Sequence, residues 1–213
     1  MTVSKTRKSN KTRGTLFVVS APSGAGKTTL CKLLLKKNPD LKLSVSYTTR
    51  PPRKGERDNI DYTFISKARF MKMIDKGEFA EWATVHGNLY GTSIRRLKEF
   101  NRAGYDIILD IDTRGAMQIK KRYEDALYIF ILPPSMEVLR KRLVNRGTDP
   151  REVIAERLDN AKKEIAYSRH YDYIVVNDKI DKAYNELESI IISSRLRTSK
   201  VGPKRTEKIY KIK

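Results

Sequence analysis

The stretch Phe17-Val18-Val19-Ser20-Ala21-Pro22-Ser23-Gly24-Ala25-Gly26-Lys27-Thr28-Thr29-Leu30 decides the fold. It runs from an apolar segment through a loop of small residues into a segment typical of a helix. From residue 21 to residue 28 the spacing follows the P-loop pattern G-x-x-x-x-G-K-[ST], with alanine at its first position, and in that pattern backbone N–H groups surround a phosphate. Lys27 adds a positive charge, and Thr28 offers a hydroxyl to a magnesium ion. The stretch therefore predicts a buried strand, a phosphate-binding loop and a helix.

The composition indicates a globular chain with one sizeable core. The chain has 213 residues, of which 39% are hydrophobic, and no apolar run approaches the roughly 20 residues of a membrane span. No signal peptide is recognisable, so we expect a cytoplasmic protein without a membrane partner. One cysteine excludes an intramolecular disulfide, and two histidines far apart argue against zinc.

The net charge of +20 would by itself suggest a nucleic-acid partner. Residues 1–14 carry +5 of it and residues 195–213 carry +7, so most of the excess lies in two tails. We expect these tails to be flexible, because charge runs of this kind are commonly mobile, and we do not expect nucleic acid as a partner. RNA binding by the tails stays open as a second activity of lower rank.

Strand and helix patterns alternate along the rest of the chain. Near-continuous apolar runs predict buried strands at 15–20, 105–110, 127–132 and 173–176, and an alternating run predicts a strand at 43–47. Helices are predicted at 27–37, 67–76, 93–103, 135–147 and 181–197, and a further helix begins with Asp149 as N-cap and Pro150 at its first position and continues at helical spacing to Ile165. Short strands at 62–65 and 79–85, with a turn at 87–88, indicate a small inserted subdomain. This order predicts an α/β fold, with a mostly parallel sheet covered by helices on both faces and a site at the carboxyl ends of its strands.

Five motifs in one order resemble guanylate kinase. They are the P-loop, the segment at 44–56 with Arg50 and Arg53, Asp61-Tyr62-x-Phe64, Gly87-Asn88-x-Tyr90-Gly91-Thr92, and Leu109-Asp110-Ile111-Asp112. The resemblance covers residues 15–196. It implies a P-loop NTPase-type sheet at 15–197 with a GMP-binding insert at about 48–96, a helical lid at about 140–160, and basic tails at 1–14 and 198–213. It also implies transfer of the γ-phosphoryl group of ATP to GMP with the assistance of Mg²⁺.

The resemblance also assigns roles to single residues. The phosphates of ATP would meet Ala21, Pro22, Ser23, Gly24, Ala25, Gly26, Lys27, Thr28 and Thr29, and Thr28 and Asp110 would hold magnesium. The phosphate of GMP would meet Arg50, Arg53, Tyr62 and Tyr90, while Asp112 would lie near the nucleoside. Lys27, Arg50 and the lid residues Arg142, Arg146 and Arg157 would act in catalysis, which fits a reaction that depends on alignment and charge stabilisation. Thr113-Arg114-Gly115 and Asn59-Ile60 depart from the pattern common in the family.

Glu81 is the candidate for recognition of the base. By resemblance it accepts hydrogen bonds from N1–H and the exocyclic amino group of guanine, with Ser46 and Thr92 on the same pocket. Adenine presents a bare acceptor at N1, so a carboxylate there predicts strong preference for GMP over other monophosphates. The sequence does not determine the oligomeric state. A non-catalytic module that binds proteins is the alternative of a different class, but the P-loop retains its lysine and threonine.

Overall fold

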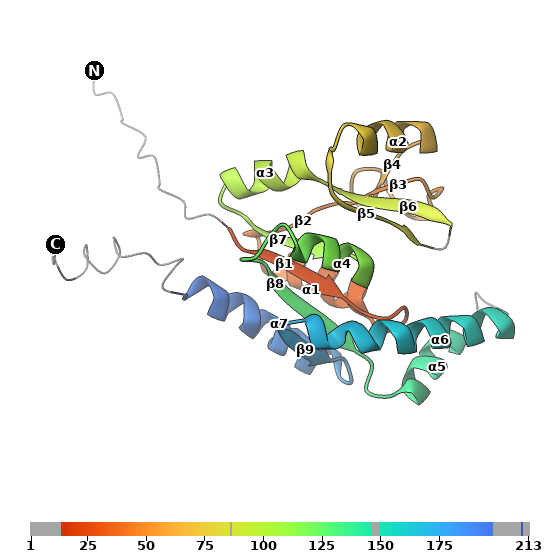
Figure 1. Cartoon of the computed structure of the whole chain (residues 1–213). Helices are drawn as coiled ribbons and strands as arrows, with labels where there is room; N and C mark the ends of the chain where they lie inside the picture. The colour runs from red at the N-terminus through yellow and green to blue at the C-terminus, as the bar shows by residue number, and fades with distance from the viewer. Residues whose placement is uncertain (1–13, 86, 146–149, 198–209, 211–213) are drawn as a thin grey trace, which may run out of the picture.

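A five-stranded parallel sheet forms the centre of the computed structural model, which describes residues 14–85, 87–145, 150–197 and 210 (Figure 1). Its spatial order is β2-β7-β1-β8-β9, and every neighbouring pair is parallel. The strands are β1 (Leu16–Ser20), β2 (Leu41–Leu43), β7 (Asp106–Asp110), β8 (Leu127–Leu132) and β9 (Tyr173–Val176). This sheet confirms the predicted fold class.

Alternate residues of β1 serve two separate cores, one on each face of the sheet. Phe17 and Val19 pack in the core of α1 (Lys27–Lys37) and α7 (Ile180–Arg195), whereas Val18 packs in the core of α3 (Ile94–Arg102) and α4 (Thr113–Lys120). All three side chains are fully buried or nearly so. Because successive side chains of a strand point to opposite faces, a continuous apolar run is what a strand covered on both faces requires.

A second sheet of four strands stands beside the central one, with α2 (Lys67–Asp75) packed on it (Figure 1). Its order is β4-β3-β6-β5, from the strands β3 (Tyr47–Thr48), β4 (Thr63–Phe64), β5 (Phe79–Val85) and β6 (Asn88–Ser93). Phe70 of α2 stacks on Phe79 of β5 with ring centroids 4.4 Å apart, so this unit has its own small core. The predicted turn at 87–88 contains Gly87 with a φ of +76°, while Asn88 already belongs to β6.

Two helices, α5 (Met136–Asn145) and α6 (Arg151–Ala166), lie on the side of the central sheet that is away from the second sheet (Figure 1). Leu139 and Leu143 of α5 pack on Ile154 and Ala161 of α6 in a core of their own. The short helix η1 (Tyr167–His170) then leads into β9. Figure 1 shows α5 and the beginning of α6 projecting beyond the sheet at one end of the molecule. None of the helices in the described ranges is both long and apolar enough to cross a membrane.

Four details of the sequence prediction were wrong. The predicted strand at 43–47 is divided between β2 and β3, which belong to different sheets. Helix α4 was not predicted. Pro150 is the N-cap of α6 rather than its first residue, and Asp149 lies outside the described residues. Strand β9 lies at the edge of the sheet, with Ile174 52% exposed, although its apolar run is typical of a central strand.

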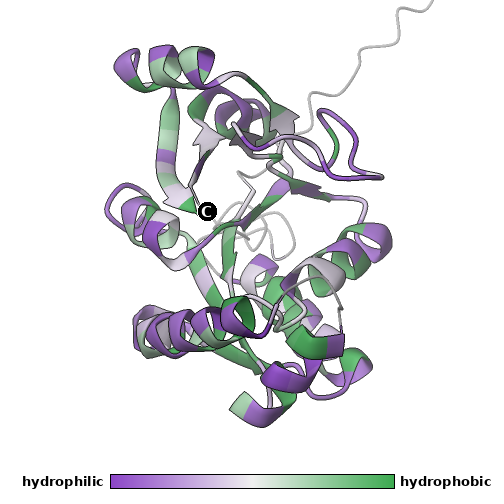
Figure 2. Ribbon diagram, turned by 90° about the vertical axis from the view of Figure 1, so that its right-hand side faces the viewer, coloured by the Kyte–Doolittle hydropathy of each residue, from purple (hydrophilic) through white to green (hydrophobic). Residues whose placement is uncertain are grey.

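The helices carry both hydrophilic and hydrophobic residues along their length, whereas the central strands are mainly hydrophobic (Figure 2). The predicted helix bounds at 27–37 and strand bounds at 79–85 and 127–132 agree with α1, β5 and β8. The predicted basic tails lie outside the described residues, apart from positions 14 and 210.

Candidate active site

The loop between β1 and α1 has the backbone of a phosphate cradle. Gly24 and Gly26 have φ angles of +94° and +93°, which disfavour any residue with a side chain. A Cβ at Gly26 would also lie 2.3 Å from Asn177 Nδ2, and one at Gly24 would lie 3.0 Å from Leu139 Cδ1. Glycine is therefore required at both positions by conformation and by space.

Lys27 is held at the end of the cradle by strand β7 and the loop after it. Its Nζ lies 2.5 Å from Asp110 Oδ1 and donates to the carbonyl of Ile111 at 2.9 Å. Burial favours the neutral amine, but the carboxylate of Asp110 outweighs it and raises the pKa of Lys27 overall. The lysine is thus a fixed cation beside the loop.

A cleft of about 290 Å³ joins this cradle to the second sheet. The central sheet contributes the loop and the residues after β7, and the second sheet contributes β5, β6 and the segment before β3. Of the predicted site residues, the cleft is lined by Ala21, Pro22, Ser23, Gly24, Gly26, Lys27, Thr28, Thr29, Ser46, Tyr62, Glu81, Tyr90, Asp110 and Asp112. The cleft lies at the carboxyl ends of β1 and β7, where the sequence placed the site.

Glu81 is a buried carboxylate on the wall of this cleft, with 4% of its surface exposed. The hydroxyl of Thr92 donates to Glu81 Oε1 at 2.6 Å. Burial raises the pKa of Glu81 to about 7, with Thr92 acting against the shift and the neighbouring Asp112 adding to it. Asp112 itself caps α4, because its Oδ1 accepts a hydrogen bond from the N–H of Gly115 at 2.7 Å.

Arg50 forms a second polar centre next to the cleft. Its Nη2 lies 2.7 Å from Glu56 Oε1, and its Nε donates to the hydroxyl of Tyr90 at 3.1 Å. Burial opposes the charge of Glu56, but hydrogen bonds from Arg50 and from the N–H of Arg53 lower the pKa of Glu56 overall. The side chain of Arg53 is exposed. An anion therefore already binds Nη2 of Arg50, and in this structure that anion is the carboxylate of Glu56.

Arg142 and Arg157, two of the three arginines predicted for the lid, do not line the cleft in this structure. Arg142 donates to the carbonyls of Asn177 at 2.8 Å and of Ala25 at 3.4 Å. Arg157 is partly buried in α6, and Arg146 lies outside the described residues. Ala25, Arg50, Arg53 and Thr92 also lie outside the lining, although Arg50 and Thr92 bind residues that belong to it.

Glu164 lines the cleft and was missed by the sequence prediction. It lies on α6, and its carboxylate accepts a hydrogen bond from the N–H of Ser23 in the cradle. Burial raises the pKa of Glu164, although the nearby charge of Lys27 acts against the shift. The sequence did contain one signal for Glu164, because it lies seven residues after the predicted site residue Arg157 and so on the same face of the helix.

Comparisons with known proteins agree with this geometry. The family model for guanylate kinase matches residues 13–194. The guanylate kinases of Geobacter metallireducens and Geobacter sulfurreducens are 57% and 56% identical, over 93% and 90% of this chain and 98% and 94% of their own. The crystal structure of guanylate kinase from Anaplasma phagocytophilum superposes with a TM-score of 0.78 at 33% identity, covering 95% of this chain and 98% of that one.

The match extends over nearly the whole chain, and the sequence identity is high. It includes the cradle, the second sheet and the α5–α6 pair. The chain therefore belongs to the guanylate kinase family, whose enzymes transfer the γ-phosphoryl group of ATP to GMP and release ADP and GDP.

Proposed function

We propose that the chain carries out this transfer in the one cleft where the cradle and Glu81 face each other. The observation that supports this most is that the cradle, through every residue from 21 to 29 except Ala25, and the buried carboxylate of the second sheet line the same cleft. A phosphate acceptor is already ionised at neutral pH, so the reaction needs alignment and neutralisation of charge rather than a general base.

The base of GMP would bind at Glu81. Its free Oε2 and the Oε1 shared with Thr92 offer acceptors to the N1–H and amino group of guanine. Ser46 lines the same part of the cleft. Because an ionised carboxylate accepts and does not donate, a base that lacks these donors would leave the buried carboxylate with the Thr92 hydroxyl and no donor from the base.

The phosphate of GMP would take the place that Glu56 holds at Arg50. In this structure Arg50 Nη2 donates to both carboxylate oxygens of Glu56, and a phosphate could accept from the same nitrogen, so the exchange keeps the charge of Arg50 paired. Tyr90 is already bonded to Arg50, and the Tyr62 ring lies 5.3 Å from its guanidinium carbon, so both hydroxyls are near the same position. Arg53 would join them from the exposed side.

ATP would bind through the cradle and Lys27, with Mg²⁺ at its phosphates. Thr28 and Asp110 line the cleft together, and a hydroxyl and a carboxylate are the oxygen donors that fit a magnesium ion retaining several waters. The ion would neutralise charge that develops on the phosphoryl oxygens. The adenine side would extend toward Asn177 and Asp178, which line a neighbouring hollow with Gly24, Gly26 and Thr29.

Residues of about 140–160, which include the end of α5 and the first part of α6, would act as a lid, and residues of about 48–96 would act as the GMP-binding insert. Arg142, Arg146 and Arg157 would reach the transferred phosphoryl group after closure. In this structure Arg142 is held by backbone carbonyls of the cradle and of Asn177, so closure must move it.

An ADP-release assay with ATP, Mg²⁺ and each of GMP, AMP, CMP and UMP tests these assignments. We expect strong preference for GMP, loss of turnover in Lys27→Met, and loss of GMP turnover in Glu81→Ala with an unchanged circular dichroism spectrum. Glu124→Ala, at an exposed carboxylate outside the cleft, is the matched control and should behave as wild type. A Glu81→Ala enzyme that still prefers GMP would disprove the base assignment.

A further inference from the structure

A second, larger hollow of about 970 Å³ lies between α2 and α3, and the kinase site does not use it. Ser46 lines the catalytic cleft, whereas the next residue, Tyr47, lines this hollow. Successive residues of an extended segment point to opposite sides, so the two sites lie on opposite faces of the second sheet. Six cations line its walls: Arg69, Lys72, Lys76, Arg95, Lys98 and Arg102.

The six cations form two stripes with the same spacing. On α2 and its C-cap they are residues 69, 72 and 76, and on α3 they are residues 95, 98 and 102. Positions i, i+3 and i+7 share one face of a helix, and seven residues of helix span about 10 Å. Over a similar length a helical nucleic-acid strand presents about three phosphates. Each wall therefore suits a short run of phosphodiesters.

Protein carboxylates do not neutralise this charge. Within the described ranges, Arg95 is the one member of the six with an ion pair, at 3.8 Å to Glu99, and Glu78 is the other acidic residue of the lining. The lining as a whole therefore carries a net charge of +4. The exposed faces of α5 and α6 differ, because Lys141 and Lys163 form close pairs with carboxylates one turn away. On an ordinary solvated helix face we expect cations paired in this way, and the cations of the hollow differ from that pattern.

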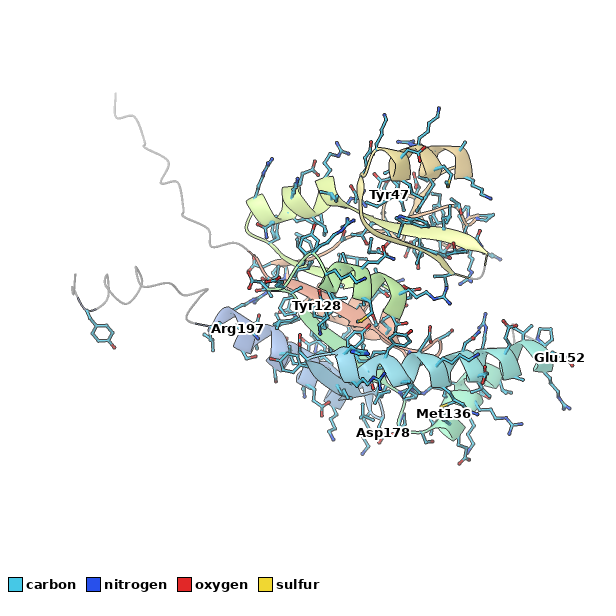
Figure 3. The ribbon with its side chains drawn as sticks, viewed as in Figure 1. Tyr47, Tyr128, Met136, Glu152, Asp178 and Arg197 are labelled. Atoms are coloured by element: carbon cyan, nitrogen blue, oxygen red, sulfur yellow. The ribbon has the colours of Figure 1, made fainter. Side chains whose placement is uncertain are left out.

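The lining of the hollow also includes three apolar or aromatic residues. Tyr47, Met73 and Ile94 line the hollow, with 9% of Tyr47 and of Met73 exposed, and Figure 3 labels Tyr47 beneath α2 on the side toward α3. Inorganic polyphosphate has no apolar part to place there, whereas the bases of a single strand do. Cations together with apolar and aromatic residues are the combination that binds single strands without sequence preference.

We propose that the hollow between α2 and α3 binds single-stranded nucleic acid, with the phosphates on the two stripes of cations and the bases toward Tyr47, Met73 and Ile94. Most of the net positive charge of the sequence lies in the two tails. The six cations of the hollow are separate from the tails and belong to the folded part of the chain. Since the hollow and the catalytic cleft are on opposite faces, bound nucleic acid leaves the GMP site accessible.

The test measures binding of a fluorescent 12-nucleotide RNA strand by anisotropy between 50 and 300 mM salt. The full-length wild type is compared with a hollow variant, Lys72→Ala/Lys98→Ala/Arg102→Ala, and with a control variant, Lys36→Ala/Lys121→Ala/Lys162→Ala, which loses three exposed cations elsewhere. All three proteins keep the tails, so the charge of the tails is constant. GMP kinase activity is measured in parallel and should stay within about twofold in both variants.

We expect the hollow variant to bind RNA at least about tenfold more weakly at 100 mM salt, with a salt slope lower by about two, and the control variant to lose less than threefold. Equal losses in the two variants would overturn the proposal, because net charge or the tails would then explain the binding. Absence of salt-dependent RNA binding in the wild type would also overturn it. Inorganic polyphosphate that competes as well as RNA at equal phosphate would exclude a role for the bases.

Discussion

Glu81 of β5 and Gly115 of α4 approach each other so closely that a side chain at position 115 would collide with the carboxylate. A Cβ on Gly115, in the first turn of α4, would lie 2.5 Å from Glu81 Oε2 on β5. The carboxylate therefore has its position because α4 has no side chain there. Two hydrogen bonds extend this contact into a cluster of four residues. Thr92 donates to the other oxygen of Glu81, and Asp112 accepts from the N–H of Gly115.

Gly115→Ala should consequently weaken GMP binding. Alanine is the better helix former by about 1 kcal/mol, so helix propensity alone predicts a more stable protein with unchanged activity. The contact with Glu81 predicts instead a KM for GMP raised by about tenfold or more, with a smaller change in the KM for ATP. Steady-state kinetics with each substrate varied in turn distinguish the two results. An unchanged KM for GMP would show that the carboxylate moves aside freely.

The pH dependence of guanine binding should follow Glu81. Its pKa of about 7 means that the carboxyl group is mostly protonated below neutral pH, and a protonated carboxyl cannot accept both guanine donors. Guanosine has no phosphate that titrates, so its dissociation constant, measured by calorimetry from pH 5.5 to 8.5, isolates this group. We expect the constant to be level above pH 7 and to rise about tenfold per pH unit well below it. A level profile throughout would contradict the role of Glu81.

Glu81 should also reduce stability at high pH. A carboxyl with a pKa of 4.5 when unfolded and about 7 when folded binds more protons in the native state between these values, so the free energy of unfolding falls as pH rises through that window. The full effect is on the order of 3 kcal/mol. Glu81→Gln removes it, and its melting temperature should exceed that of wild type by several degrees at pH 8 and by much less at pH 5. An equal difference at both pH values would point to packing instead of charge.

The sequence predicted the parts of the site whose chemistry is local. The cradle from Gly24 to Lys27 follows from spacing alone, because backbone conformation there is determined by the residues themselves. Helix α4 was missed because it is short and because Asp112 was interpreted as a ligand and not as a helix cap. At Asn59 the sequence left the loop shape open, and the structure gives a left-handed φ of 59°, which asparagine tolerates better than most residues.

Other parts depend on tertiary contacts that no local pattern contains. The edge position of β9 follows from the order of the strands in the sheet. The apolar run at 173–176 does not reveal it, because a central strand would have the same kind of sequence. The direction of Arg142 is likewise determined by two carbonyls that lie 35 and 117 residues away in the chain. Long side chains on a helix have several reachable partners, and the sequence does not choose among them.

Glu164 should position the cradle rather than take part in the transfer. Its carboxylate accepts from the N–H of Ser23 and lies near Lys27, so Glu164→Ala should raise the KM for ATP several-fold. Glu164→Gln keeps an acceptor for Ser23 and should recover most of the loss, whereas a residue needed for its charge would not be rescued. Glu156→Ala, an exposed acid on the same helix, is the control. Equal kinetics in the Ala and Gln variants would exclude the hydrogen bond as the cause.

Closure of the lid should be measurable in solution. The α5–α6 pair has a separate hydrophobic core, and Arg142 must leave the carbonyls of Ala25 and Asn177 before it can reach a phosphoryl group in the cleft. Because the lid and the second sheet lie on opposite sides of the cradle, both ligands together should bring them closer than either does alone. We expect small-angle scattering to show a smaller radius of gyration with GMP and a non-hydrolysable ATP analogue than with either one. A radius that stays constant when both sites are saturated would rule out a large closing motion and would require the lid arginines to act from their present positions.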